Sequence, residues 1–219
     1  MWDSATIQMI IIGLFETLYM TLFSTLLAYV IGLPLGVVLV ITEKNSILPI
    51  PWLNNVLNFV VNILRSVPFL ILLIAVIPIT RAITGTTIGS TATVVPLVIA
   101  ATPFIARMVE SSIKEVDKGV IEAALSMGAS PFHIIYKVLI PEAKPALVVG
   151  AAIATTTILG YSAMAGIVSG GGLGDIAIRY GYYRGQNGIM IVTVILLVIV
   201  VQILQEIGMR IAGLQDKRK

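Results

Sequence analysis

The chain alternates between long apolar runs and short polar segments, and this pattern predicts its architecture. A helix that crosses about 30 Å of hydrocarbon needs roughly 20 mostly apolar residues, because each helical residue advances the chain by about 1.5 Å. Five runs reach that length. They lie within Ile10–Ile41, Val56–Thr80 and Ala82–Ala106, and at about Ala146–Ile167 and Gln186–Gln205. We therefore predict an all-α membrane protein with five transmembrane helices.

Composition supports the bilayer as the solvent for most of the chain. Hydrophobic residues make up 58% of the 219 positions and charged residues 11%, whereas soluble domains average about 45–50% and about 25%. A single soluble core of this length could not hide so much apolar side chain. The lack of cysteine excludes disulfides and thiolate metal sites. We expect residues 1–219 to form a single transmembrane domain.

The distribution of positive charge predicts the orientation. Cytoplasmic segments of membrane proteins are enriched in Lys and Arg. With the N-terminus outside and the C-terminus inside, only Arg81, Arg179 and Arg184 lie on the outer side. The other eleven of the 14 Lys and Arg residues are cytoplasmic: Lys44, Arg65, Arg107, Lys114, Lys118, Lys137, Lys144, Arg210, Lys217, Arg218 and Lys219. The sequence therefore favours an N-out/C-in topology.

Two charged residues fall inside the apolar runs. Glu16 lies near the outer end of the first run, and Arg65 lies near the start of the second. A charge at the bilayer centre costs about 2.5–3.5 kcal/mol on insertion scales. We interpret both residues as interfacial anchors, with Arg65 snorkelling towards water. Polar contacts inside a transporter are the alternative.

Several prolines interrupt the predicted spans, namely Pro34, Pro68, Pro78, Pro96 and Pro103. An interior proline leaves a helix carbonyl without its donor, and membrane helices tolerate this where a neighbour or a water-filled path satisfies the freed group. Kinked helices around a translocation pathway are one interpretation. Ordinary close packing through small residues, as at Gly32 and Gly36 beside Pro34, is the other.

The hydrophilic segment at about 107–144 predicts a helix, a tight elbow and a second helix. Val120–Met127 has the composition of a short helix, and Gly128 is placed to end it in a left-handed turn. Ser130 then suits an N-cap, with Pro131 at the first helical position. Pro141 is expected to end or bend this second helix. The elbow lies on the cytoplasmic side between the third and fourth spans.

Such an elbow presents a small rigid helix to a partner. Alanines permit close backbone approach and apolar side chains can fill a groove. The residues in question are Glu122, Ala123 and Ala124, with Ile121, Leu125 and Met127 as the apolar set. The alternative is an amphipathic helix that lies on the inner leaflet.

The residues Glu122-Ala123-Ala124, Gly128 and Val138-Leu139-Ile140-Pro141 resemble the EAA motif of bacterial ABC importer permeases. The spacing of the motif is kept, with Val138 in place of Ile and Ile140 in place of Leu. The resemblance implies a type I ABC importer permease fold. It also implies that the elbow is a coupling helix for an ATPase, formed by Glu122, Ala123, Ala124, Leu125, Met127 and Gly128.

Further segments are similar to the permeases of methionine importers. They are Arg65–Phe69, Pro103–Glu110, Gly160–Gly166, Gly170–Asp175 and Arg179–Tyr182. This resemblance implies methionine, possibly as both enantiomers, as the substrate. It also implies a multi-pass protein of the bacterial inner membrane that pairs with a second copy of itself, two ATPase subunits and an external substrate-binding protein or lipoprotein.

The same resemblance suggests a gate in the fourth span. Methionine is flexible and polarisable, so it can seal a narrow path and repack when the path opens. We expect paired Met164 side chains, beside Tyr161 and Ser162, to help close the translocation pathway. Ordinary packing against lipid or helices is the alternative.

The chain lacks the residues of an ATPase or another enzyme. It has no G-x-x-x-x-G-K-[ST] phosphate loop, so ATP and Mg are expected on the partner ATPase, with no cofactor in this chain. Its single histidine, His133, excludes a metal site with several His or Cys ligands, and no nucleic-acid partner is expected. The open alternatives are a permease for another amino acid or small solute, a membrane scaffold and an ion-coupled carrier.

Overall fold

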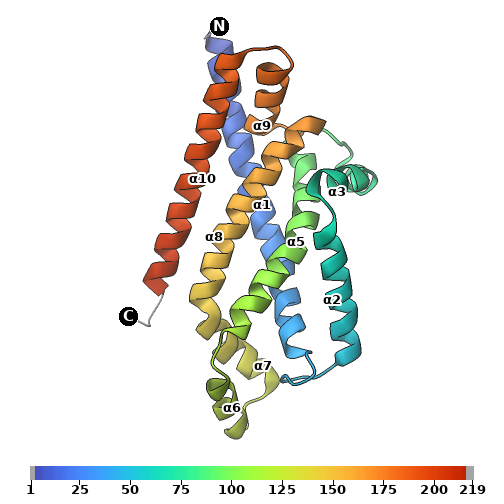
Figure 1. Cartoon of the computed structure of the whole chain (residues 1–219), viewed down its shortest axis with the longest axis vertical. Coiled ribbons are helices and arrows are strands. Elements are labelled where there is room, and N and C mark those ends of the chain that lie inside the picture. The colour runs from blue at the N-terminus through green and yellow to red at the C-terminus, as the bar shows by residue number, and fades with distance from the viewer. Residues whose placement is uncertain (1–2, 216–219) are drawn as a thin grey trace.

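Four long helices run along the length of the molecule in the computed structural model, which describes residues 3–215. They are α1 (Ser4–Ile41), α5 (Ser90–Lys114), α8 (Ile140–Met164) and α10 (Asn187–Gln215) (Figure 1). Within these described residues the chain forms helices and turns and no strand. The prediction of an all-α architecture is therefore confirmed.

The second predicted span is broken. In place of one helix over Val56–Thr80, the chain forms α2 (Pro51–Ser66), α3 (Phe69–Ala75) and α4 (Ile77–Thr84). The axis turns by 103° between α2 and α3. Pro68 explains the break, because it has no N–H to donate and its ring pushes the preceding residue out of the helical region. The described residues thus contain four helices long enough to span a membrane, or five if the bent pair counts as one span.

The third predicted span was displaced. The helix begins at Ser90 and ends at Lys114, whereas the apolar run suggested Ala82–Ala106. Gly85 and Gly89 separate α4 from α5 with φ angles of 75° and 93°, a left-handed conformation that favours glycine. The charged end of α5 stays helical, so the hydrophilic segment is shorter than the predicted 107–144.

The elbow leads without a break into the next span. After α6 (Lys118–Ser126) come α7 (Pro131–Ile134) and a π-helical turn, η1 (Ile135–Leu139), which continues into α8. Pro141 does not end this helix, contrary to one of the two expectations for it, since residues 131–168 form one long helical stretch. The widened turn directly before Pro141 alters the local bonding pattern where the proline N–H is missing.

A compact turn joins α8 to α10 at the opposite end of the molecule. It contains a short 3₁₀ turn, η2 (Ala165–Val168), then α9 (Gly172–Ile176) and a π-helical segment, η3 (Ala177–Tyr182). Ser169, Gly171 and Gly172 have φ angles of 59°, 83° and 76°. These left-handed positions let the chain reverse its direction between α8 and α10.

Helix α1 packs against α5 through small residues. A Cβ on Gly36 would lie 2.6 Å from the carbonyl oxygen of Ala106, and one on Gly32 would lie 3.0 Å from that of Thr102. Helices in membranes associate in this way because small side chains let the backbones approach. Close packing is therefore what surrounds Pro34, which lies within a continuous α1.

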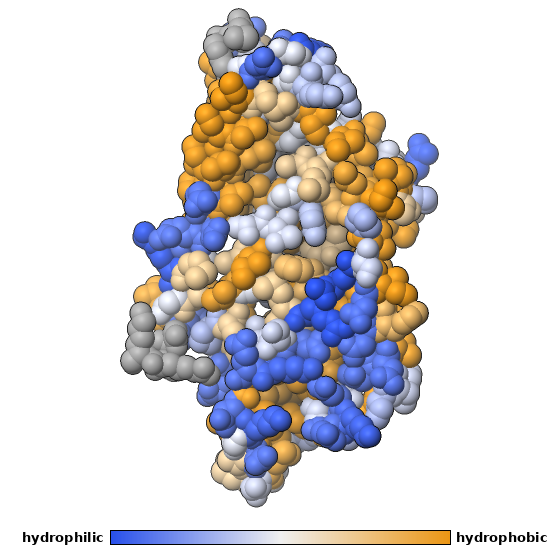
Figure 2. Space-filling model, in the orientation of Figure 1, coloured by the Kyte–Doolittle hydropathy of each residue, from blue (hydrophilic) through white to orange (hydrophobic). Residues whose placement is uncertain are grey.

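The outward faces of the long helices are apolar. Examples are Phe15 on α1, Phe59 on α2 and Ile195 on α10, which are exposed by 66%, 66% and 51%. Figure 2 shows apolar surface towards the α9 end and hydrophilic surface gathered towards the end that carries α6 and α7. This distribution suits a helix bundle with a hydrocarbon solvent around much of its length.

Candidate functional site

The first helix of the elbow begins and ends as local chemistry predicts. The Asp117 carboxylate accepts a hydrogen bond from the Gly119 N–H at 2.6 Å and caps α6. Gly128 ends the helix with φ at 77°. The Ala129 N–H then donates to the Ala124 carbonyl at 3.1 Å, which is the 6→1 bond of a Schellman turn. The predicted role of Gly128 is confirmed.

The second helix of the elbow starts at the predicted residue. Ser130 has extended backbone, and its Oγ accepts a hydrogen bond from the His133 N–H at 3.4 Å. Pro131 occupies the first turn, where its missing N–H costs nothing. The inward-facing Ile134 is fully buried, and it fixes the second helix against the bundle.

The elbow has an inward and an outward face. Ala124 is 5% exposed and belongs to the main apolar core, and Ile121 packs against the same core. Leu125 and Met127 are 46% and 81% exposed, and Glu122 and Ala123 are exposed as well. The structure therefore divides the predicted coupling set. Ala124 anchors the elbow to the bundle, while Glu122, Ala123, Leu125, Met127 and Gly128 remain on the surface.

The outward surface continues onto the second helix. Phe132 and Tyr136 are 76% and 61% exposed. Between the two helices lies a hollow of about 600 Å³, lined by residues that include Met127, His133 and Lys137. Exposed apolar side chains gathered beside polar ones are typical of an interaction site.

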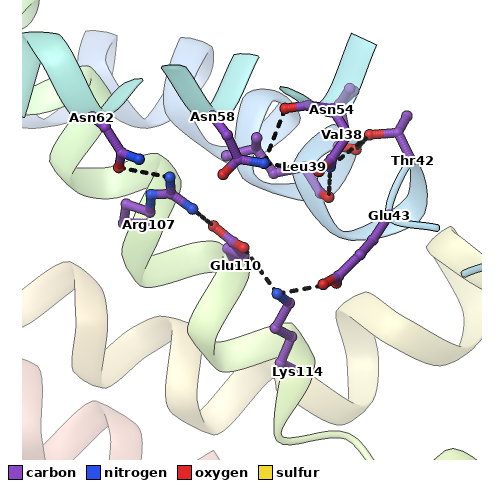
Figure 3. Close-up of polar contacts among 10 residues, drawn as sticks. All are labelled: Val38, Leu39, Thr42, Glu43, Asn54, Asn58, Asn62, Arg107, Glu110 and Lys114. Atoms are coloured by element: carbon purple, nitrogen blue, oxygen red, sulfur yellow. Dashed lines mark hydrogen bonds and ion pairs between the residues drawn. The ribbon is translucent and has the colours of Figure 1, made fainter. Parts of the chain in front are cut away.

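A chain of ion pairs runs along the end of α5 that leads to the elbow (Figure 3). The Glu110 carboxylate accepts from Arg107 Nη1 at 2.5 Å and from Lys114 Nζ at 3.0 Å. Lys114 also reaches Glu43 at 3.0 Å. Glu110 is only 8% exposed, and a buried carboxylate is tolerated where cations and hydrogen bonds compensate it.

Three asparagines on α2, spaced four residues apart, join this helix to the ion pairs of α5 and to α1. Asn62 Oδ1 accepts from Arg107 Nη2 at 2.8 Å. One turn along, Asn58 Nδ2 donates to the Asn54 carbonyl at 2.9 Å, and Asn54 Nδ2 donates to the Leu39 carbonyl at 2.7 Å (Figure 3). The network fastens α1, α2 and α5 together just above the elbow. Sequence analysis missed it, although the four-residue spacing of the asparagines was a visible signal.

The three residues predicted to form a gate do not converge within one chain. The Tyr161 ring stacks on Phe69, with centroids 4.5 Å apart and planes 5° apart. Ser162 is 1% exposed, and its hydroxyl donates to the Leu159 carbonyl at 2.8 Å. Met164 is 46% exposed at the end of α8. Tyr161 thus contacts the start of α3, directly after the break at Pro68, and Met164 is free to meet another surface.

At the α9 end of the molecule, Glu16 has a structural partner. Its carboxylate accepts from the Gly172 N–H at 2.7 Å, and the neighbouring Thr17 hydroxyl accepts from the Leu173 N–H at 2.8 Å. These bonds hold the start of α9 against α1. Of the two interpretations of Glu16, the polar contact inside the protein is the one observed. Asp175 and Arg179 form an ion pair beside it.

The chemistry of the described residues is that of packing and docking. Within residues 3–215, no group of three His, Cys, Asp or Glu side chains is placed to hold a metal ion. Arg65 lies in the last turn of α2, and not near the start of a span as the apolar run suggested. It lines a cavity together with Arg107.

The comparisons with known proteins agree with this geometry. The chain is 48% identical over 217 residues to the Probable D-methionine transport system permease protein MetI of Vibrio cholerae, which aligns 99% of this chain with 96% of the relative. It is 44% identical over 203 residues to the protein of the same description from Pasteurella multocida, covering 93% and 94%.

A solved structure described as inward-facing conformations of the MetNI methionine ABC transporter matches with a TM-score of 0.97 and 45% identity, covering 99% of this chain and all of the other. The model of one family, described as binding-protein-dependent transport system inner membrane component, matches residues 32–218. The chain therefore belongs to the family of binding-protein-dependent transport system inner membrane components.

Proposed function

We propose that this chain is the membrane-spanning permease subunit of an ATP-driven importer of methionine. The observation that carries the proposal is the elbow between α5 and α8. It is anchored inward by Ala124 and presents Leu125 and Met127 outward, so it offers a rigid apolar projection at the end of an ion-paired helix. A partner that moves this projection moves the bundle with it, which is the coupling that an importer needs.

The assignment of methionine as the substrate rests on the relatives. The Vibrio cholerae and Pasteurella multocida proteins are described as D-methionine permeases, and the matching solved structure is described as a methionine transporter. Identities of 44–48% over nearly the whole chain support the same substrate here. Transport of both enantiomers is part of the proposal.

The proposed topology is N-out/C-in in a bacterial inner membrane, with the bent α2–α3 unit as the fifth span. Helix α1 starts at the α9 end, and α10 finishes towards the end that carries α6 and α7 (Figure 1). Most Lys and Arg residues were assigned to that second end, in line with the positive-inside rule. Lys217, Arg218 and Lys219 of that set lie outside the described residues.

The proposed assembly contains two copies of this chain about a two-fold axis, because one chain supplies half a pathway. Two ATPase subunits, which carry ATP and Mg, dock on the elbows, with Glu122 contributing a charge contact. An external binding protein or lipoprotein delivers the substrate at the α9 end. ATP binding draws the ATPases and their elbows together, and the bundle alternates between inward-open and outward-open states.

The proposed gate consists of paired Met164 side chains, with Tyr161 and Ser162 behind them. Met164 is the exposed member of the three. Tyr161 ties its helix to the break at Pro68 through the Phe69 stack, and buried Ser162 holds the local helix. A thioether is soft enough to repack as two such residues meet and part.

Proteoliposomes test the proposal. They would hold this chain, its ATPase and the external binding protein, and the measurement is ATP-dependent uptake of labelled methionine. We expect uptake that disappears when either partner is omitted. ATP-driven uptake of a different solute would keep the permease and overturn the substrate. A flux by this chain alone would favour an ion-coupled carrier, and no uptake by the intact complex would favour a scaffold.

A further inference from the structure

The exposed Arg65 lines an open cavity on the side of the bundle, which extends along α5 as far as Glu115. The cavity measures about 520 Å³ and lies between α2, α5 and α8. Its lining includes Arg65, Phe104, Met108, Ser111, Glu115 and Ile153. Cavities of roughly 300–1,000 Å³ with mostly apolar walls and a few polar groups are the usual sites for small molecules. Both the size and the lining of this cavity therefore suit a small amphiphilic ligand.

The Arg65 guanidinium is the unpaired positive charge of this cavity, and the Glu115 carboxylate in the same lining is likewise without an ion pair among residues 3–215. Among these residues the Arg65 guanidinium has no ion pair and no side-chain hydrogen bond. Arg107, in the same lining, is engaged by Glu110 and Asn62. A guanidinium without an anion attracts one strongly, because its fork of N–H donors matches a carboxylate in a bidentate pair.

The position of Arg65 is deep in the proposed span. It follows the start of α2 at Pro51 by fourteen residues, which is about 21 Å of helix. Phe104, in the same lining, precedes the end of α5 at Lys114 by ten residues, or about 15 Å. An ionisable residue at such a depth, directly before the break at Pro68, is typical of a substrate pathway.

The remaining lining matches the side chain of methionine. Phe104 and Met108 are half-buried, and Ile153 is 44% exposed. A thioether packs favourably against an aromatic ring and against other flexible apolar groups. Glu115, in the same lining, supplies a carboxylate that can accept from an ammonium group. Carboxylate, ammonium and thioether thus each have a complementary group in the cavity.

We propose that this cavity is a substrate site of the permease itself, in which Arg65 binds the α-carboxylate of the transported amino acid on its way to the cytoplasm. This inference rests on the proposed function. It adds a binding residue to a chain whose specificity would otherwise lie entirely with the external binding protein.

Cysteine protection tests the site directly, because the natural chain has no cysteine. Ser111→Cys places a reporter thiol in the cavity. Its labelling by a charged thiosulfonate reagent is followed by mass spectrometry of this chain, in the permease–ATPase complex without nucleotide or binding protein. Methionine at a concentration of twice its dissociation constant should lower the labelling rate about threefold. Thr86→Cys, an exposed position before α5, is the matched reporter outside the cavity and should not respond.

Two comparisons isolate the contribution of Arg65. Methioninamide lacks the carboxylate and should not protect the Ser111→Cys reporter at the same concentration. Arg65→Gln should abolish protection by methionine, whereas Arg65→Lys, which keeps the charge but loses the bidentate fork, should retain part of it.

Three results would overturn the proposed site. They are equal protection in Arg65→Gln, equal protection by methioninamide, and no protection up to tens of millimolar methionine in a complex that still transports it. The last result leaves the importer intact and removes only this site, because uptake by the Ser111→Cys complex is measured separately. Loss of uptake by the wild-type complex would instead contradict the proposed function.

Discussion

The two ends of the molecule use glycine for different physical reasons. At the turn between α8 and α10, which is the outer turn in the proposed topology, glycines are required by space. A Cβ on Gly174 would lie 2.5 Å from the Cα of Ala163, and one on Gly166 would lie 2.5 Å from the Asp175 nitrogen. At the elbow, a Cβ on Gly128 would meet nothing within 4 Å. There the glycine is required by its φ angle of 77° alone.

This difference separates a structural end from the proposed docking end. The outer turn closes on itself, with backbone against backbone and with α1 side chains bonded to the start of α9. The elbow instead leaves free space and exposed apolar side chains around its glycine. Substitutions at the outer turn should therefore change the stability of the chain, and substitutions at the elbow should change its assembly with a partner.

The largest effect is expected at the outer turn. Gly174→Ala forces a methyl group into the Ala163 backbone, which cannot yield as a flexible side chain would. Overpacking of this kind costs about 1–3 kcal/mol and sometimes more. We expect a clearly lower midpoint of thermal unfolding in detergent.

Gly213→Ala is the control for this prediction, since a Cβ at Gly213 meets nothing within 4 Å in the helical α10. Alanine is favoured over glycine there by about 0.5–1 kcal/mol, so the midpoint should stay or rise. If both variants unfolded at the wild-type temperature, the outer turn would not be the close-packed end.

At the elbow, Gly128→Val should remove coupling. A β-branched residue at φ 77° strains the backbone by about 1–2 kcal/mol, and the elbow can relieve that strain by opening. We expect loss of ATP-dependent uptake, with the ATPase no longer copurifying at the wild-type ratio.

Gly185→Val matches this change at the other end. Gly185 has φ at 66° and nothing within 4 Å of its Cβ position, so it carries the same backbone strain on the outer side. Normal assembly and transport by Gly128→Val, or an equal loss in Gly185→Val, would refute a specific role for the elbow.

A smaller effect is expected from the exposed apolar side chain beside that glycine. Met127 is 81% exposed, so Met127→Asp should change the stability of the chain by no more than about 0.5 kcal/mol. A charge in a desolvated groove should weaken ATPase binding about tenfold or more, as 1.4 kcal/mol already does. The affinity is measured with the purified ATPase in detergent.

Ser126→Asp adds the same charge one residue away without removing the methionine. We expect this control to bind the ATPase nearly as the wild type does. Equal weakening in both variants would mean that charge near the elbow matters, and not the apolar contact of Met127.

Much of the elbow could be predicted because its determinants are local. Gly128, Ser130 and Pro131 each specify a turn or a cap by their own backbone chemistry, and the structure reproduces all three. The apolar runs likewise revealed the long helices. Their ends were less predictable. The helix α5 continues through the charged residues after Arg107, where Glu110 pairs with Arg107 and Lys114 and where Val109 and Ile113 are buried.

The remaining features depend on contacts between distant segments. Pro68 signalled a break, but the 103° turn depends on what α3 packs against, including the Phe69–Tyr161 stack. The bond between Asn62 and Arg107 joins residues far apart in sequence. The sequence could not show that Ala124 faces inward, because nothing in the EAA pattern distinguishes Ala124 from Ala123.

Met164 is the exception at the structural end, since its replacement should affect stability only slightly. It is 46% exposed directly before the outer turn, so Met164→Ala should cost less than about 1 kcal/mol. The expected change is functional, namely leak of methionine through the complex without ATP. Ile167→Ala, at a similarly exposed apolar position of 54%, should stay tight. If a Met164→Ala complex kept normal coupling of ATP hydrolysis to transport and showed no leak, the proposed gate would be wrong. Met164 would then be an ordinary packing residue.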